Sequence, residues 1–327
     1  MHECLTWSTG ESKISVRSLA WHDLLTFYRY RRQILITDSA QALTHGSPIG
    51  PLALLSRINP TIETHTGICP ARDGEPAIIG HMHYASGDRS ARLAYLMPSS
   101  ALDSPNLAAL LETLAVRAGE WGAFHLVAEI DETSPALDQM RHSGFTVYAW
   151  QRIWQFRSAI ENHKPKTNGW QLSTRIDENA IRNLYQSLVP PLVQSAEPLT
   201  SRRLQGWVYR CEGELLAYVE TINGPQGIYL QPLIHPAVEN VSQVITDLLH
   251  HQPSHTDRPV YMAIRSYQAW LEMVVRDLEC QVGPRQGLLV KHLAVALRST
   301  VLARHSVLEK YKAEPSAPMV HNATRQK

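Results

Sequence analysis

The sequence has few cysteines, no long apolar run and almost no net charge. Its four cysteines are far apart and form no C-x-x-C pair, which argues against a zinc ribbon or a disulfide framework. No stretch approaches the ~18 apolar residues that a membrane-spanning helix needs. Lysine and arginine number 31 against 30 aspartates and glutamates, so the chain has no strong basic field for nucleic acid.

The amino terminus lacks the pattern of an export signal. No charged start followed by an apolar run occurs in residues 1–10. We therefore expect a cytoplasmic protein that has neither a membrane nor a nucleic acid as partner. The chain has 327 residues and an ordinary apolar fraction of 44%, which favours two globular domains. The sequence carries no signal of the oligomeric state.

An internal repeat is the strongest signal in the sequence. Residues 94–98 read AYLMP and residues 228–232 read IYLQP, at a spacing of 134 residues (228 minus 94). The same spacing continues without a gap through an apolar helix pattern to residues 126–128 and 260–262. A match of strand, helix and strand together indicates that the chain contains two copies of one unit.

The repeat sets the expected domain organisation. Copy 1 is predicted at residues 1–157, a polar linker at 158–169 and a more divergent copy 2 at 170–300. The polar end of the chain, residues 301–327, is predicted to be disordered.

Each copy is predicted to be α/β (α+β), with a mixed and mostly antiparallel sheet. The expected order is strand, helix, three strands, helix, strand, helix and a final hairpin, which in copy 1 covers residues 146–156. Asp73-Gly74 and Glu212-Gly213 are turn pairs that favour a hairpin at the same place in both copies. The extra length of copy 1, between residues 32 and 60, is rich in glycine and proline and reads as loop.

This element order resembles the Gcn5-related N-acetyltransferase (GNAT) fold, in tandem. The local resemblance is best where a helix ends at Gly144-Phe145 before a final strand, because glycine readily ends a helix in the left-handed conformation. The resemblance covers residues 13–156 well and residues 170–295 more loosely. It implies an N-acetyltransferase that transfers an acyl group from acyl-CoA to a small-molecule or protein amine. The alternative is a catalytically inactive relative that serves as a binding or scaffolding protein.

The resemblance also implies where acetyl-CoA would bind. The site is a V between two splayed strands, which in copy 1 are residues 91–96 and 124–129. Strand backbone would pair with the pantetheine arm, and the next helix start would hold the diphosphate through free N–H groups. The implied cofactor-binding residues are Leu96, Met97, Ser99, Ser100, Ser104 and Asn106.

The loops after these strands differ from the family pattern. Residues 99–106 and 233–240 contain no glycine and no lysine or arginine. Two interpretations of the first loop stay open: it binds phosphate, or Ser104 and Pro105 cap a helix in the usual way. The family's acid tyrosine falls on Met140 in copy 1 and on Val274 in copy 2.

Four residues are candidates for proton transfer. Glu129 ends the strand at the V and could take a proton from an amine. His81 and His83 lie on one face of a strand, where they could act as base, bind a metal together with His65, or simply line a polar surface. Tyr95 could serve as the acid or pack in the core. No metal site is predicted.

Overall fold

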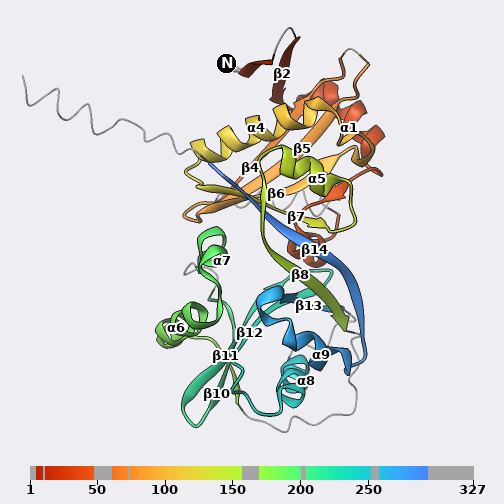
Figure 1. Cartoon of the computed structure of the whole chain (residues 1–327). Coiled ribbons are helices and arrows are strands. Elements are labelled where there is room, and N and C mark those ends of the chain that lie inside the picture. The colour runs from red at the N-terminus through yellow and green to blue at the C-terminus, as the bar shows by residue number, and fades with distance from the viewer. Residues whose placement is uncertain are drawn as a thin grey trace, which may run out of the picture. The chain divides into compact units, whose positions relative to one another are not determined.

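The structure is a computed structural model that describes residues 5–9, 12–47, 61–72, 74–156, 169–199, 204–251 and 258–293. These residues belong to one compact unit (Figure 1). Most of the predicted linker, residues 158–168, and the predicted disordered tail lie outside the described residues.

Copy 1 follows the predicted order from β2 to α5, with an additional strand, β1, before it and two additional short elements in the stretch that we expected to be loop. Its elements are β1 (Leu5–Thr9), β2 (Ser12–Ser18), α1 (Leu24–Tyr30), β3 (Leu35–Ile36), α2 (Ser39–His45), β4 (Ile62–Cys69), β5 (Ile78–Ala85), β6 (Ser90–Met97), α4 (Pro105–Glu120), β7 (His125–Asp131), α5 (Ala136–His142) and β8 (Thr146–Phe156). The expectation of loop was wrong at β3 and α2.

Copy 2 repeats the plan. Its elements are β9 (Trp170–Leu172), α6 (Glu178–Leu188), α7 (Pro191–Ala196), β10 (Gly206–Cys211), β11 (Glu214–Asn223), β12 (Ile228–Ile234), α8 (Val241–His251), β13 (Val260–Arg265), α9 (Trp270–Arg276) and β14 (Cys280–His292).

The strands form one mixed sheet in which most neighbours are antiparallel. Its order is β1-β2-β4-β5-β6-β7-β14-β8-β13-β12-β11-β10-β9. The pairs β6–β7 and β12–β13 are parallel, and each pair marks the centre of one copy. The predicted α/β class and the mixed, mostly antiparallel sheet are therefore confirmed, and the central parallel pair occurs once in each copy.

The two copies exchange their last strands. Strand β14 of copy 2 lies between β7 and β8 of copy 1, and β8 in turn pairs with β13 of copy 2 (Figure 1). The hairpin that we predicted in residues 146–156 was therefore wrong. That stretch is a single strand, because its antiparallel partners come from copy 2 rather than from its own continuation.

Helix α4 covers one face of the sheet of copy 1. Its apolar side packs on β4 and β5, with Leu107, Leu110, Leu111 and Leu114 buried (Figure 1). Gly80 of β5 permits this approach, since a Cβ there would lie 3.0–3.2 Å from Leu114, Leu96 and Leu110. On the other face of the same strands, Ile68 and Ile79 belong to a second apolar cluster, and His81 and His83 line the cavity described below.

Two short helices connect the copies reciprocally. Helix α2 of copy 1 packs on the β11–β12 turn, where the amide of Gln226 donates to the carbonyl of Thr44 at 2.8 Å. Helix α7 of copy 2 packs on copy 1, where the Ser90 hydroxyl donates to the carbonyl of Ala196 at 2.7 Å. Each copy thus contributes one helix to the surface of the other.

Candidate functional site

The groove between β6 and β7 of copy 1 contains part of the chain itself. The two strands pair only from Ser90 to Arg92 and then diverge. Residues 33–39, which we call the inserted segment, enter the space between them, and Leu35 and Ile36 pair with Leu96 and Tyr95 as strand β3. The groove that the resemblance assigns to a pantetheine arm is thus bonded to the protein's own backbone.

Thr37 of the inserted segment bridges both walls of the groove. Its amide donates to the carbonyl of Ala94 on β6 at 3.0 Å, and its carbonyl accepts from the amide of Glu129 on β7 at 2.9 Å. The Thr37 hydroxyl also donates to the carbonyl of Leu93 at 2.7 Å. Thr37 therefore occupies a backbone carbonyl of β6 and a backbone amide of β7.

The residues predicted to bind the cofactor have other partners here. The amide of Ser99 donates to the carbonyl of Gln33 at 2.8 Å, and the Ser100 hydroxyl donates to the side chain of Gln33 at 3.1 Å. Ser104 is the N-cap of α4 and accepts from the amide of Asn106 at 3.2 Å. The side chains of Leu96 and Met97 are buried in the core. These contacts support the helix-capping interpretation of the loop.

The groove of copy 2 is different. Strands β12 and β13 pair over residues 228–230 and 260–262 and then separate. Among the described residues, no main-chain segment pairs inside this groove; the Gln268 side chain reaches across to the carbonyl of Ile234 at 3.2 Å. A cleft of about 900 Å³ lies at the start of α8, and Glu212, Glu214 and Glu239 line it.

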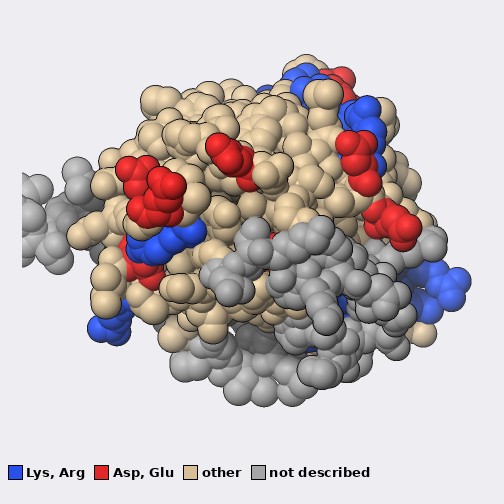
Figure 2. Space-filling view, turned by 90° about the horizontal axis from the view of Figure 1, so that it is seen from below, with Lys and Arg blue, Asp and Glu red and all other residues tan. Residues whose placement is uncertain are grey.

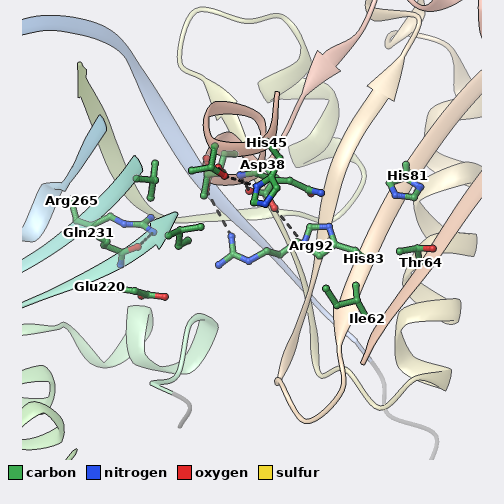
Figure 3. Close-up of a pocket in the computed structure, with 16 residues that line it drawn as sticks. Asp38, His45, Ile62, Thr64, His81, His83, Arg92, Glu220, Gln231 and Arg265 are labelled. Atoms are coloured by element: carbon green, nitrogen blue, oxygen red, sulfur yellow. Dashed lines mark hydrogen bonds and ion pairs between the residues drawn. The ribbon is translucent and has the colours of Figure 1, made fainter. Parts of the chain in front are cut away.

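A second cavity, of about 290 Å³, lies where the two copies meet (Figure 3). We call it the junction cavity. Copy 1 contributes β4, β5, β6, β7 and α2, and copy 2 contributes β11, β12 and β13. Its lining residues are Asp38, Ala40, Gln41, Thr44, His45, Ile62, Thr64, His81, His83, Arg92, Glu129, Glu220, Ile222, Tyr229, Gln231 and Arg265.

A buried ion-pair network spans the junction. Arg265, which is only 3% exposed, donates through Nη2 to Glu197 Oε2 at 3.1 Å and to Gln231 Oε1 at 3.3 Å. The Tyr148 hydroxyl donates to Glu197 Oε1 at 2.6 Å. Burial is the largest single effect and opposes the charge of Arg265, but the Glu197 carboxylate and three neighbouring tyrosines together raise the pKa of the guanidinium.

Arg92 points into the junction cavity from β6 (Figure 3). Its guanidinium lies 3.8 Å from Glu197 Oε1 and 4.0 Å from Glu129 Oε1, which exceeds hydrogen-bond length. Burial disfavours its charge, but the carboxylates of Asp38, Glu197 and Glu129 raise the pKa of Arg92. Arg92 is therefore charged, and it attracts the carboxylates of Glu197 and Glu129 without a hydrogen bond to either.

Glu129 is buried and firmly held. Its Oε2 atom accepts from the amide of Ser39 and from Gln151 Nε2, both at 3.1 Å. Burial, followed by the charge of Asp38, raises the pKa of Glu129, while Arg265 and Arg92 act in the opposite direction. The result is a carboxyl group that gives up its proton less readily than an exposed glutamate.

The predicted histidines reach the same cavity. His83 Nε2 lies 3.5 Å from Asp38 Oδ2, and burial lowers the pKa of the imidazole. His81 Nδ1 is 2.7 Å from the Thr66 hydroxyl, and the ring stacks on Tyr95 at 5.1 Å. Three of the predicted proton-transfer residues, Glu129, His81 and His83, thus line one cavity, and Tyr95 is buried beside it.

His65 does not join them. Its neighbour Thr64 lines the cavity, and the alternation of a strand turns His65 to the other face, where it meets Trp121 edge-on at 6.4 Å. The suggested three-histidine metal site was therefore wrong. Within the described part of the chain, no cluster of three or more His, Cys, Asp or Glu side chains could hold a metal ion.

Among the described residues around the junction cavity, carboxyl groups outnumber guanidinium groups. Three buried carboxylates, Asp38, Glu129 and Glu197, face the two guanidiniums of Arg92 and Arg265. The half-buried Glu220 on the wall adds further negative charge. The outer surface is unlike this: on the face shown in Figure 2, the coloured acidic and basic residues are interspersed.

Several of these residues escaped the sequence analysis. Asp38, Arg92, Glu197 and Arg265 were not singled out, although an arginine inside the apolar strand pattern ARLAYL is a usable signal of a buried charge pair. The strand register also differs from the sequence repeat. Arg92 pairs with Val127, and Tyr229 pairs with Tyr261 in the corresponding position, so Tyr229 matches Arg92 rather than Tyr95.

Comparisons with known proteins found similarity among solved structures. No protein-family model and no curated protein matches the sequence. Among solved structures, the chain is similar to a GCN5-related N-acetyltransferase from Sphaerobacter thermophilus, with 13% identity and a TM-score of 0.49 over 85% of this chain and 95% of that one. It is also similar to a tandem GNAT protein from the clavulanic acid biosynthesis pathway, with 14% identity and a TM-score of 0.43 over 85% and 98%.

A third similar structure is an acetyltransferase of the GNAT family from Colwellia psychrerythraea, with 9% identity and a TM-score of 0.42 over 85% of this chain and 99% of that one. No helix in the described part of the chain is long and apolar enough to cross a membrane.

Proposed function

We propose that the protein binds a small amine in the junction cavity and acts on it as an N-acyltransferase. The acidic lining of the cavity carries this proposal, because the side chains of Asp38, Glu129 and Glu220 all line it. Carboxylates in a partly buried cavity attract an ammonium ion, because the low local dielectric strengthens their interaction with a cation. The volume of about 290 Å³ is near the lower limit of small-molecule sites, ~300–1,000 Å³, so the amine is small.

In this proposal Glu129 is the base. Its raised pKa makes it better suited to take a proton from an ammonium group near neutral pH than an exposed glutamate would be. Within the described part of the chain its Oε1 atom accepts no hydrogen bond and lies 4.0 Å from Arg92, which leaves Oε1 to receive that proton. Tyr229, whose pKa burial raises, stays a phenol and holds a proton at the cavity wall.

The acyl donor that the resemblance implies is acetyl-CoA, whose thioester would supply the carbonyl carbon for the amine. Copy 1 does not fit this donor, because the inserted segment is bonded to both walls of its groove. We assign the donor to the groove of copy 2, which begins beside Gln231 and Arg265 of the junction cavity. The carboxylates at the start of α8 repel a diphosphate, so we expect the affinity to be low.

A second candidate function is amine binding without transfer. The filled groove of copy 1 and the acidic helix start of copy 2 favour it, because neither offers the usual grip on a diphosphate. Both candidate functions require binding of the amine, and only acyl transfer also requires binding of an acyl donor.

One experiment separates the two candidates. Small primary amines are titrated calorimetrically, and thiol release from acetyl-CoA is then followed with and without the amine. We expect amine-dependent release that falls ~10²–10⁴-fold in Glu129→Gln, as for loss of a general base. Glu120→Gln, on the exposed side of α4, is the matched control. Heat of amine binding without thiol release would support binding alone, and the absence of both would overturn both candidates.

A further inference from the structure

The inserted segment does more than fill the groove of copy 1. Its backbone bonds to β6 through Leu35, Ile36 and Thr37, and Thr37 also accepts from the amide of Glu129 on β7. The segment is thus fixed to the strand that carries the proposed base.

The same segment holds the side chain of that base. Ser39 is the first residue of α2, and its amide donates to Glu129 Oε2 at 3.1 Å. Asp38, the N-cap of α2, accepts from the amide of Gln41 at 3.1 Å and lines the junction cavity. One short stretch of chain therefore places Asp38 in the cavity and restrains Glu129 at both its backbone and its carboxylate.

A second set of contacts comes from the exchanged strands. Gln151 on β8 donates through Nε2 to Glu129 Oε2 at 3.1 Å and to Gln286 Oε1 at 3.0 Å. The Ser39 hydroxyl donates to the same Gln286 oxygen at 3.3 Å. Gln286 lies on β14 of copy 2, so both copies contribute to the network around Glu129.

We propose that the inserted segment permanently occupies the groove of copy 1. In this segment Ser39 is a positioning residue, which holds the Glu129 carboxylate through its backbone N–H. The groove of copy 1 has thereby become a support for the junction cavity and does not take an acyl donor. The inference rests on the proposed function in assigning the base to Glu129, but its test needs no turnover.

The test removes that single N–H. In Ser39→Pro the amide donor and the hydroxyl are both lost, whereas Ser39→Ala loses only the hydroxyl. Proline suits this position, because it is favoured at the first residue of a helix and Asp38 already has the extended conformation (φ −137°, ψ 95°) that must precede it. The difference between the two variants therefore isolates the N–H that binds Glu129.

The titration of Glu129 is followed by carboxyl ¹³C NMR in the full chain. A hydrogen bond to a charged acceptor favours the ionised form, so its loss should raise the proton affinity of Glu129 about tenfold in Ser39→Pro relative to Ser39→Ala. The same proton affinity of Glu129 in Ser39→Pro and Ser39→Ala would overturn the positioning role. Circular dichroism and thermal unfolding of both variants check that the fold is retained, and if Ser39→Pro fails to fold, the exchange measurement below decides alone.

Hydrogen exchange in the wild-type chain tests whether the segment is permanent. The amides of Thr37 and Ser39 should exchange at the same rate with and without millimolar acetyl-CoA. Faster exchange on adding acetyl-CoA would show that the donor displaces the segment and would overturn the proposal. Absence of thiol release would count against acyl transfer only, since neither measurement depends on it.

Discussion

At the scale of residues, hydrogen bonds to buried carboxylates hold the junction cavity together. Glu197 accepts from Tyr148 and from Arg265, and both donors are buried with it. A bond to a charged acceptor is worth more than a neutral one, because the low dielectric of the interior strengthens it.

We expect Tyr148→Phe to lower the free energy of unfolding by about 1.5–3 kcal/mol, since it leaves one Glu197 oxygen without its phenol donor. Tyr84→Phe is the matched control. Its hydroxyl donates to the neutral carbonyl of Asp88 at 2.8 Å, so its loss should cost only about 0.5–1.5 kcal/mol. Urea unfolding of both variants measures the difference, and equal losses would contradict the charged character assigned to the Glu197 contact.

The raised pKa of Glu129 predicts a pH dependence of stability. The unfolded chain releases this proton near the ordinary value of 4.5, while the folded chain keeps it to higher pH. The stability contributed by this group is complete below 4.5 and is lost as the pH rises toward the folded pKa. Stability of the wild type relative to Glu129→Gln should therefore fall from pH 4.5 upward, by about 1.4 kcal/mol for each unit of elevation. Urea unfolding at a series of pH values measures this; a gap that stays constant above pH 4.5 would show that the pKa is not raised.

At the scale of elements, the fit of α2 against the β11–β12 turn closes one wall of the cavity. Gly224 lies so close to this helix that a Cβ would meet the carbonyl oxygen of Thr44 at 2.2 Å. A side chain at this position must therefore move α2 or the turn.

We expect Gly224→Ala to lower the free energy of unfolding by about 1–3 kcal/mol and to weaken amine binding, because Thr44 and Asp38 move with α2. Asn223→Ala, an exposed position in the same turn, controls for the loss of turn chemistry. Calorimetric titration with the amine and urea unfolding give the two readouts. Unchanged amine affinity in a destabilised Gly224→Ala protein would show that α2 is not a wall of the binding site.

The sequence predicted long elements better than it predicted their partners. The helix that the repeat and the Ser104 cap predicted is α4, Pro105–Glu120, because its apolar period and its cap are local signals. Strand β3 has two residues and lies in a stretch rich in glycine and proline, so no periodicity could reveal it.

The site was predicted in part for the same reason. Glu129 and the histidine pair were found from their places on strands. Arg265 and its partner Glu197 are 68 residues apart, and Arg92 meets Glu197 from the other copy, so no local pattern joins them. The exchange of β8 and β14 could not be predicted either. A strand shows the same alternation of apolar and polar residues whether its partner is its own hairpin or a strand of the other copy.

At the scale of the whole molecule, the exchange makes the two copies interdependent. Strand β14 pairs along both β7 and β8, so copy 1 is complete only when copy 2 supplies this strand. The predicted boundaries at residues 157 and 170 stay a prediction about the sequence repeat.

We expect the described unit to unfold in one cooperative transition. Trp121 reports on copy 1, where it stacks on Tyr84, and Trp207 reports on copy 2, where it meets His251. Fluorine NMR of 5-fluorotryptophan should show both signals lost at the same denaturant concentration, because the shared strands couple the copies. Two separate midpoints would show that each copy is stable alone despite the exchange.

The position of β14 in the chain also has a consequence for synthesis. A ribosome delivers β7 and β8 of copy 1 long before it delivers residues 280–292. During that interval the nascent chain carries two strands whose shared neighbour has not yet been made, and unpaired strand edges invite association with other chains. Copy 1 therefore depends on a strand that is made after all the other described strands, and pauses in translation between β8 and β14 lengthen the time for which these edges need protection by chaperones.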